Sequence, residues 1–323
     1  MPEEARRTAF DLAEGLHLAY AAAALHALGI LTALRLPGTA GDLAARFGID
    51  PEMLNGTLAY LAARTTLVVQ SGDRYAAGDG YDDGARFVLD LHVGAFAPVS
   101  ADLAAVLRHP REACTHVNRA AQTAAFADDA GDAVLAGILR QLGFAAIVEL
   151  GCGGGALLRA LARADPQFIG VGVDANPAMC SRARDCIRAE GLKARLQIVQ
   201  GDAHDPQTWL SAMPESATVV ARDFLNELCR DGGRAAIAWL RILRERMPGH
   251  VLVIADYHGR LGQVAVASDP GVLLHDFVQL VSGQGVPPPD LTGWAALYEA
   301  AGCELAHAIE DRQSVRFIHL IRL

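Results

Sequence analysis

VELGCGGGALLRALARADPQFIGVGVDANP, residues 148–177, is the stretch of sequence that decides the fold. It predicts a buried strand, a glycine-rich turn, an amphipathic helix and a second buried strand that ends at Asp174. Two strands joined through a helix form a βαβ unit, in which the strands are parallel. A glycine-rich first turn in such a unit is typical of sheets that bind a cofactor beyond the carboxyl ends of their strands.

Strands and helices continue to alternate from this unit to the C-terminus. We predict strands at residues 145–150, 168–174, 196–201, 218–223, 251–256, 304–309 and 314–321. Continuous apolar strands such as VLVIAD (251–256) are typical of a parallel sheet covered on both faces. The short turn at 310–313 allows only an antiparallel last strand. The sequence therefore predicts an α/β fold: a Rossmann-like, doubly wound sheet of seven strands with an antiparallel last strand.

The first third of the chain has a different pattern. After an Ala-rich helical stretch, it predicts a helix at 40–47, a second helix that Asp50 caps and Pro51 opens, and a hairpin with strands at 67–70 and around Tyr75. This order is that of a winged helix. We expect two domains: a helical, winged-helix dimerisation and lid domain at 1–130, and a cofactor-binding domain at 131–323.

Composition excludes several classes of function. The chain has 323 residues and a formal net charge of −9, and its second winged-helix helix (51–64) carries one Arg and one Glu, so we expect no nucleic-acid partner. The start lacks a signal-peptide pattern. The apolar stretch at 16–36 carries His17, His26 and Arg35, so we expect no membrane insertion. The six cysteines form no CxxC pair, which favours reduced thiols and a cytoplasmic location.

The glycine turn alone does not identify the cofactor. The run GCGGGA (151–156) nearly fits GxGxxG, so an NAD(P)-dependent oxidoreductase is the alternative from another enzyme class. However, Glu149 lies at the end of the first strand, where it would repel a pyrophosphate. The same carboxylate suits the amino group of a bound amino acid.

Acids also end the next two strands. Asp174 can accept hydrogen bonds from both ribose hydroxyls, Asp202 from an adenine amino group, and the Ala203 N–H can reach a ring nitrogen. S-adenosylmethionine offers an amine, a sulfonium, a ribose and an adenine but no phosphate, so it fits this pattern best. The predicted cofactor-binding residues are Glu149, Gly151, Gly153, Gly155, Asp174, Ala175, Asp202, Ala203 and Arg222.

Residues from about 145 to 260 resemble the class I S-adenosylmethionine-dependent methyltransferases. VELGCGGG, GVGVDANP and QGDAHD look like their first three motifs. With the winged helix in front, nearly the whole chain is similar to their small-molecule O-methyltransferases. The resemblance implies methyl transfer to a small metabolite, in secondary metabolism, by a homodimer joined through its N-terminal helices.

The resemblance fails at the catalytic base. In those enzymes a His-Asp-Trp triplet follows the fourth strand, and its His deprotonates the acceptor. This chain has FLNEL there, which puts Asn226, Glu227 and Leu228 at the three positions. A hydroxyl acceptor still needs a base, and His258 and His275 lie in segments expected to border the cleft.

A second interpretation of the same region uses a metal. Asp223 and His275 are candidate ligands of a divalent ion, Fe or Zn, that would chelate an α-keto acid and favour its enol for C-methylation. This would resemble the metal-dependent C-methyltransferases of α-keto acids. The acceptor atom, oxygen or carbon, stays open at this point. The candidate catalytic residues are His275, His258, Asn226 and Glu227.

Overall fold

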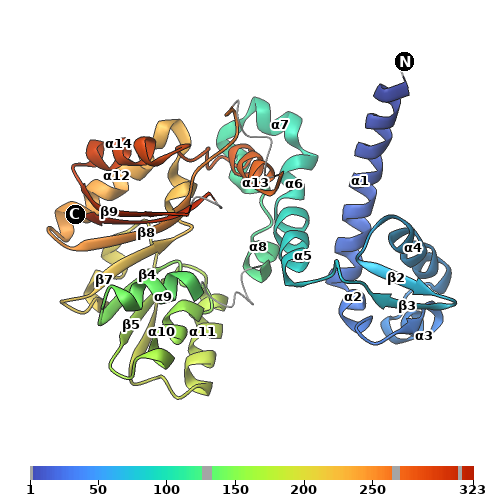
Figure 1. Ribbon diagram of the computed structural model, residues 1–323, viewed down its shortest axis with the longest axis horizontal. Coiled ribbons are helices and arrows are strands. Elements are labelled where there is room, and N and C mark those ends of the chain that lie inside the picture. Colours follow the sequence, from blue (N-terminus) through green and yellow to red (C-terminus); the bar gives the residue numbers. More distant parts are fainter. Residues whose placement is uncertain (1–2, 126–132, 264–269, 312–314) are drawn as a thin grey trace. The chain divides into compact units, whose positions relative to one another are not determined.

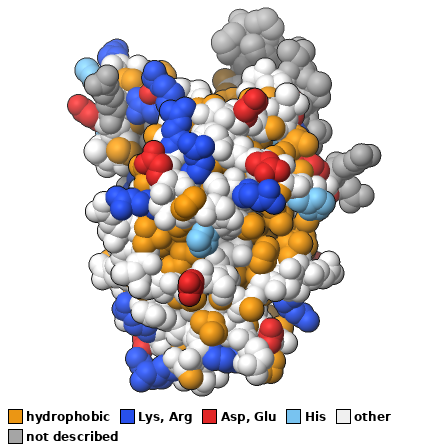
Figure 2. Space-filling model, turned by 90° about the vertical axis from the view of Figure 1, so that its left-hand side faces the viewer, with side chains coloured by type: hydrophobic (Ala, Val, Ile, Leu, Met, Phe, Trp, Pro, Cys, Tyr) orange, Lys and Arg blue, Asp and Glu red, His pale blue; other side chains and the backbone are white. Residues whose placement is uncertain are grey.

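The computed structural model describes residues 3–125, 133–263, 270–311 and 315–323. The chain divides into two compact units: residues 1–98 with 118–125, and residues 99–117 with 126–323. In the described residues, no helix is long and apolar enough to cross a membrane. Figure 2 shows acidic and basic side chains mixed over the face that it displays.

The first unit is mainly helical. A small sheet with the strand order β1-β3-β2 accompanies its helices, and β3 pairs antiparallel with both neighbours. Asp50 caps α4 as predicted, because its carboxylate accepts the N–H of Met53 at 2.9 Å. The elements are α1 (Glu3–Ala27), α2 (Ile30–Ala33), β1 (Gly38–Thr39), α3 (Ala40–Phe47), α4 (Pro51–Arg64), β2 (Val68–Ser71), β3 (Arg74–Ala77), α5 (Asp83–Val88), the π-helix η1 (Leu89–Ala95) and α8 (Arg119–Ala125).

The second unit contains a sheet of seven strands in the order β6-β5-β4-β7-β8-β10-β9. The first five are parallel, and β10 is antiparallel to both β8 and β9. The predicted α/β fold with its antiparallel last strand is therefore confirmed. The strands are β4 (Ala146–Leu150), β5 (Ile169–Asp174), β6 (Leu196–Gln200), β7 (Thr218–Arg222), β8 (Val251–Tyr257), β9 (Glu304–Glu310) and β10 (Arg316–Arg322).

Helices cover both faces of this sheet (Figure 1). On one face α12 and α14 bury Trp239 and Trp294 against the strands. On the other, α9, α10 and α11 bury side chains such as Leu139, Leu158 and Ile187. The helices are α7 (Leu103–Arg108), α9 (Ala133–Gln141), α10 (Ala156–Ala164), α11 (Pro177–Ala189), α12 (Arg230–Arg246), α13 (Pro270–Val281) and α14 (Leu291–Ala301), with short 3-10 turns η2 (Pro110–His116), η3 (Pro206–Thr208), η4 (Leu210–Ala212) and η5 (Leu225–Leu228); α6 (Ala97–Ala101) crosses the division between the units.

Candidate active site

The glycine loop lies between β4 and α10. Gly151, Gly153 and Gly155 all have a positive φ, at 69°, 53° and 70°, which L side chains rarely adopt. A Cβ at Gly151 would meet no atom within 4 Å, so the main chain there is open to a ligand. Gly155 caps the N-terminus of α10. The loop therefore offers accessible backbone beside a helix N-terminus, as the sequence predicted.

Asp174 at the end of β5 ties this loop to the neighbouring strand. Its Oδ2 accepts the N–H of Gly153 at 2.9 Å, and its Oδ1 accepts the N–H of Asn176 at 2.8 Å. Each carboxylate oxygen retains a further lone pair, so Asp174 can still accept the two hydroxyls of a ribose. Ala175, which follows, is at the same edge and is exposed.

Glu149 is the only fully buried acid of the strand β4 and lies one strand away from Asp174. Burial, and then the negative charges of Glu149 and Asp174, raise the pKa of the Cys152 thiol well above its usual range. Cys152 therefore stays protonated and packs in the loop. The effect of both carboxylates on its pKa shows that Glu149 and Asp174 lie close to the glycine loop. A buried carboxylate at this place fits the ammonium group of an amino acid.

Asp202 follows β6 and completes the row of acids. Its Oδ1 accepts the N–H of His204 at 2.9 Å and lies 3.0 Å from the His204 Nδ1. Burial raises the pKa of Asp202, but these His204 hydrogen bonds outweigh burial and hold it below the usual value. Asp202 is thus ionised at neutral pH and exposed, ready to accept a hydrogen bond from an adenine amino group.

Aromatic side chains support this end of the site, and sequence reasoning missed them. The ring of Phe224, just after β7, lies 4.8 Å from the His204 ring and 5.0 Å from that of Trp239. The Trp239 Nε1–H donates to the carbonyl of Ala203 at 2.9 Å. The position of Phe224 directly after a strand was the signal available. Together, the acids at the ends of β4, β5 and β6 and the aromatic groups beside Asp202 fit the amine, ribose and adenine of S-adenosylmethionine.

Asp223 and Arg222 end β7 on the other side of the glycine loop. Asp223 has a φ of 49°, a left-handed conformation that is rare outside glycine and typical of functional sites. Its Oδ1 accepts from the Arg316 Nη1 at 2.6 Å. Within the described residues, no group of three or more His, Cys, Asp or Glu side chains is placed to hold a metal ion. The predicted Fe or Zn site of Asp223 and His275 therefore gains no support from the described part of the chain.

Asn226 lies in η5, buried close to the end of β8. Its backbone N–H donates to Oδ2 of Asp256 at 3.0 Å, and Oδ1 of Asp256 accepts the N–H of Tyr257 at 2.9 Å. Burial, reinforced by Asp223, raises the pKa of Asp256 well above its usual range. Sequence reasoning missed Asp256 and Tyr257, although their place at the end of an apolar strand was a signal. Glu227, beside Asn226, is half-buried.

His275 lies on α13, and its side chain is close to the end of β8. Its ring is half-buried and lies 5.5 Å from the ring of Tyr257, edge to face. Burial lowers the pKa of His275, although Asp223 and Asp276 act in the opposite direction. The imidazole is therefore neutral at neutral pH, which is the form that can accept a proton.

His258 is held elsewhere. Its Nε2 lies 2.6 Å from Glu310 Oε2, and its ring lies 4.8 Å from that of Phe317 on β10. The other Glu310 oxygen lies 2.7 Å from Nε2 of His319. These contacts fix His258 between β8 and the terminal hairpin and favour a structural role. The structure thus brings Asn226 and His275 to Tyr257, and it places His258 against Glu310.

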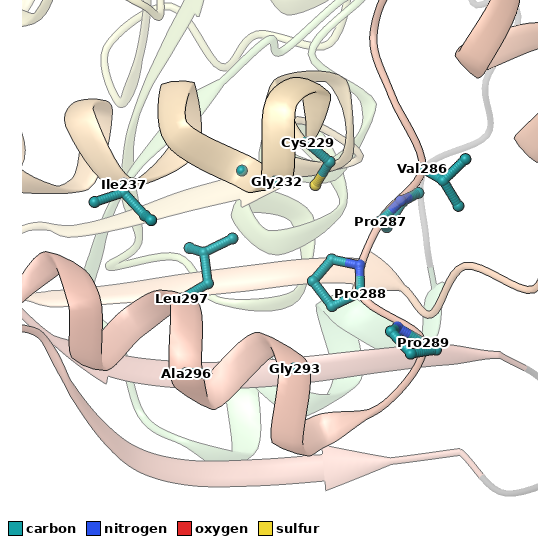
Figure 3. A pocket seen from close by; sticks show the side chains of 11 residues that line it. Cys229, Gly232, Ile237, Val286, Pro287, Pro288, Pro289, Gly293, Ala296 and Leu297 are labelled. Carbon is teal, nitrogen blue, oxygen red and sulfur yellow. The ribbon is translucent and has the colours of Figure 1, made fainter.

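A cavity of about 390 Å³ opens beside α12 and α14 (Figure 3). The prolines 287–289, Leu297 and Ile237 make its wall mostly apolar, and Cys229 lines it from the start of α12. None of the predicted site residues lines it. The cavity is therefore separate from the row of acids at the strand ends.

Comparisons with known proteins agree with this geometry. A family model described as a methyltransferase domain matches residues 147–245. No curated protein matches the sequence.

Among solved structures, the mitomycin 7-O-methyltransferase MmcR has a TM-score of 0.73 at 21% identity, covering 99% of this chain and 98% of its own. PigF, solved with SAH, has a TM-score of 0.76 at 18% identity and full coverage of both chains. CalO1, a methyltransferase in calicheamicin biosynthesis, has a TM-score of 0.65 at 23% identity, with 99% of each chain covered. The predicted class I methyltransferase fold is confirmed: residues 147–245 match a methyltransferase domain, and the chain shares the fold of these structures along its whole length.

Proposed function

We propose that this protein methylates a hydroxyl oxygen of a small metabolite, in secondary metabolism and in the cytoplasm. The observation that supports oxygen is the neutral, half-buried His275 at the carboxyl end of β8, beside Tyr257. A neutral imidazole there can take the acceptor's proton. The names of two similar structures point the same way, since MmcR is described as a 7-O-methyltransferase and another as an O-methyltransferase family protein.

Residues along one edge of the sheet would bind the methyl donor and the methyl acceptor. Glu149, Asp174 and Asp202 hold the amine, ribose and adenine of the methyl donor, which supplies an electrophilic methyl group when it is bound. The Gly151–Gly155 loop lets the donor approach the backbone. Arg222, at the end of β7, borders the same site. On the acceptor side, Asn226 and His275 orient the hydroxyl and receive its proton, so that the oxygen faces the methyl carbon in line with the departing sulfur.

Calorimetry with S-adenosylhomocysteine and NADH tests the cofactor. We expect S-adenosylhomocysteine to bind with micromolar affinity and NADH not to bind, because the acids repel its pyrophosphate. Release of S-adenosylhomocysteine, measured over a panel of phenols and α-keto acids, then tests the acceptor. We expect turnover of phenols that survives excess EDTA. Turnover of keto acids alone, abolished by EDTA, would support the metal-dependent C-methylation instead.

We also propose that the protein is a homodimer joined through α1. This helix leaves Phe10, Leu12, Leu16 and Tyr20 exposed in the single chain, by 69%, 73%, 54% and 45%. A row of large exposed apolar side chains on one helix is typical of a surface that a partner covers. Light scattering should give twice the chain mass, and Leu12→Glu with Leu16→Glu should give the monomer. A wild-type monomer at 50 µM would contradict this proposal.

A further inference from the structure

Tyr257 joins the two residues that we place on the acceptor side. It is the last residue of β8 and is buried, with 4% of its surface exposed. Its hydroxyl donates a hydrogen bond to Oε1 of Gln279 on α13. Burial raises the pKa of Tyr257 and the nearby Asp276 carboxylate raises it further, whereas the Asn226 side chain lowers it, as an amide N–H that faces the hydroxyl would. The Tyr257 hydroxyl therefore lies between side chains of α13 and of η5.

This arrangement fixes the orientation of the Asn226 side chain. The backbone N–H is held by Asp256 at 3.0 Å, and the amide side chain lies beside the Tyr257 hydroxyl, whose pKa it lowers against burial. Asn226 is 3% exposed, and its Oδ1 is buried without a hydrogen-bond partner in the described structure. A buried carbonyl oxygen without a donor is costly, because it has lost its hydrogen bonds to water. A ligand that donates a hydrogen bond to Oδ1 would recover this cost.

The aromatic ring of Tyr257 acts on the other residue. The His275 ring contacts it edge to face at 5.5 Å between centroids. His275 and Gln279 are four residues apart on α13 and so lie on the same side of the helix. The hydroxyl bond to Gln279 therefore holds the helix face that carries His275 against the end of β8.

We propose that Tyr257 is a positioning residue of the acceptor site, which sets Asn226 and His275 relative to each other and leaves Asn226 Oδ1 to bind the methyl acceptor. The acceptor then carries a hydroxyl or amino hydrogen next to the methylated position. This inference rests on the proposed function, and it deepens it by naming the atom that recognises the acceptor.

A buried hydroxyl also stabilises the fold, so the test needs a matched control. Tyr298 on α14 is buried as well, and its hydroxyl lies 2.9 Å from Nδ1 of His319. Tyr257→Phe and Tyr298→Phe each remove one buried hydroxyl bonded to a side chain of the same unit. We expect both variants to lower the melting temperature and to keep the wild-type affinity for S-adenosylhomocysteine.

The two variants should differ at the site. In Tyr257→Phe we expect the imidazole NMR signals of His275, assigned with His275→Gln, to shift or broaden, and kcat with catechol to fall about tenfold at unchanged KM for S-adenosylmethionine. In Tyr298→Phe the His319 signals should move, while His275 and kcat stay as in the wild type. Unchanged His275 signals in Tyr257→Phe, or an equal loss of kcat in Tyr298→Phe, would overturn the proposal.

Asn226 gives a second and independent test. Asn226→Leu removes the free oxygen, so KM for catechol should rise at least tenfold while S-adenosylhomocysteine binds as before. From the wild type we expect turnover of catechol and 2-aminophenol to exceed that of phenol, because phenol carries no hydroxyl or amino hydrogen next to the methylated oxygen. If Asn226→Leu binds S-adenosylhomocysteine and retains the wild-type KM, the inference fails and the proposed function stands. If the wild-type protein does not bind S-adenosylhomocysteine, the proposed function itself is wrong.

Discussion

Replacement of Asp174 by alanine should weaken the binding of S-adenosylhomocysteine at least 100-fold. The carboxylate accepts the N–H groups of Gly153 and Asn176, and in the complex it would also accept two ribose hydroxyls. A hydrogen bond to a charged group contributes about 1.5–3 kcal/mol. Loss of two such bonds to the ligand corresponds to a factor of 100 or more, because each 1.4 kcal/mol is a factor of ten. Titration calorimetry measures the effect directly.

Asp165 provides a matched control for this substitution. Its Oδ1 accepts the N–H of Gln167 at 2.8 Å, two residues on, as Asp174 does with Asn176. However, Asp165 precedes β5 and lies at the opposite end of that strand. Asp165→Ala should therefore bind S-adenosylhomocysteine within twofold of the wild type. A dissociation constant for a folded Asp174→Ala variant within threefold of the wild type would contradict the assigned role.

The sequence predicted where the glycine loop and the strand-end acids lie, because the determinants of their positions are local. A glycine loop and an acid at a strand end need only the pattern of one βαβ unit. Parallel strands then bring successive strand ends to the same edge. The predicted strand at 304–309 is β9 (Glu304–Glu310).

The acceptor side depends on contacts between residues that are distant in sequence. His258 and His275 are equivalent as candidate bases when only the sequence is considered. They differ because Glu310, 52 residues after His258, binds that ring, whereas Tyr257 supports His275. A continuous apolar run predicts that Asp256 and Tyr257 are near a buried strand end, but it does not identify their partners.

Replacement of Glu310 by leucine should lower the free energy of unfolding by about 4 kcal/mol. The two Glu310 oxygens lie 2.6 and 2.7 Å from Nε2 of the buried His258 and His319 rings. Without this carboxylate, both imidazole N–H groups stay buried with no acceptor, and each such group costs about 1–3 kcal/mol. The hairpin of β9 and β10 would therefore lose its hydrogen bond to His258. Urea unfolding measures the loss.

The measurement belongs at pH 8, because the fold's stability depends on pH here. Burial lowers the pKa of His319 below that of an exposed imidazole, although the bond to Glu310 acts in the opposite direction. The unfolded chain therefore binds a proton more readily than the folded one. Stability contributed by the neutral ring is present above about pH 6.5 and is lost as the pH falls through and below that value. At pH 8 the ring is neutral in both states, and the effect of Glu310 is measured alone.

Glu304, on the same strand, provides a control that shows what the loss of an exposed carboxylate from β9 costs. It binds Arg322 at 2.8 Å, and both side chains are exposed, so Glu304→Leu should cost less than about 1 kcal/mol. Glu310→Gln retains one acceptor oxygen and should cost about half as much as Glu310→Leu. If the unfolding free energy of Glu310→Leu lies within 1 kcal/mol of that of Glu304→Leu, the two buried histidines do not depend on the Glu310 carboxylate. The loss of unfolding free energy should be largest for Glu310→Leu, smaller for Glu310→Gln and smallest for Glu304→Leu. This order follows from the number of buried N–H groups that lose an acceptor in each variant.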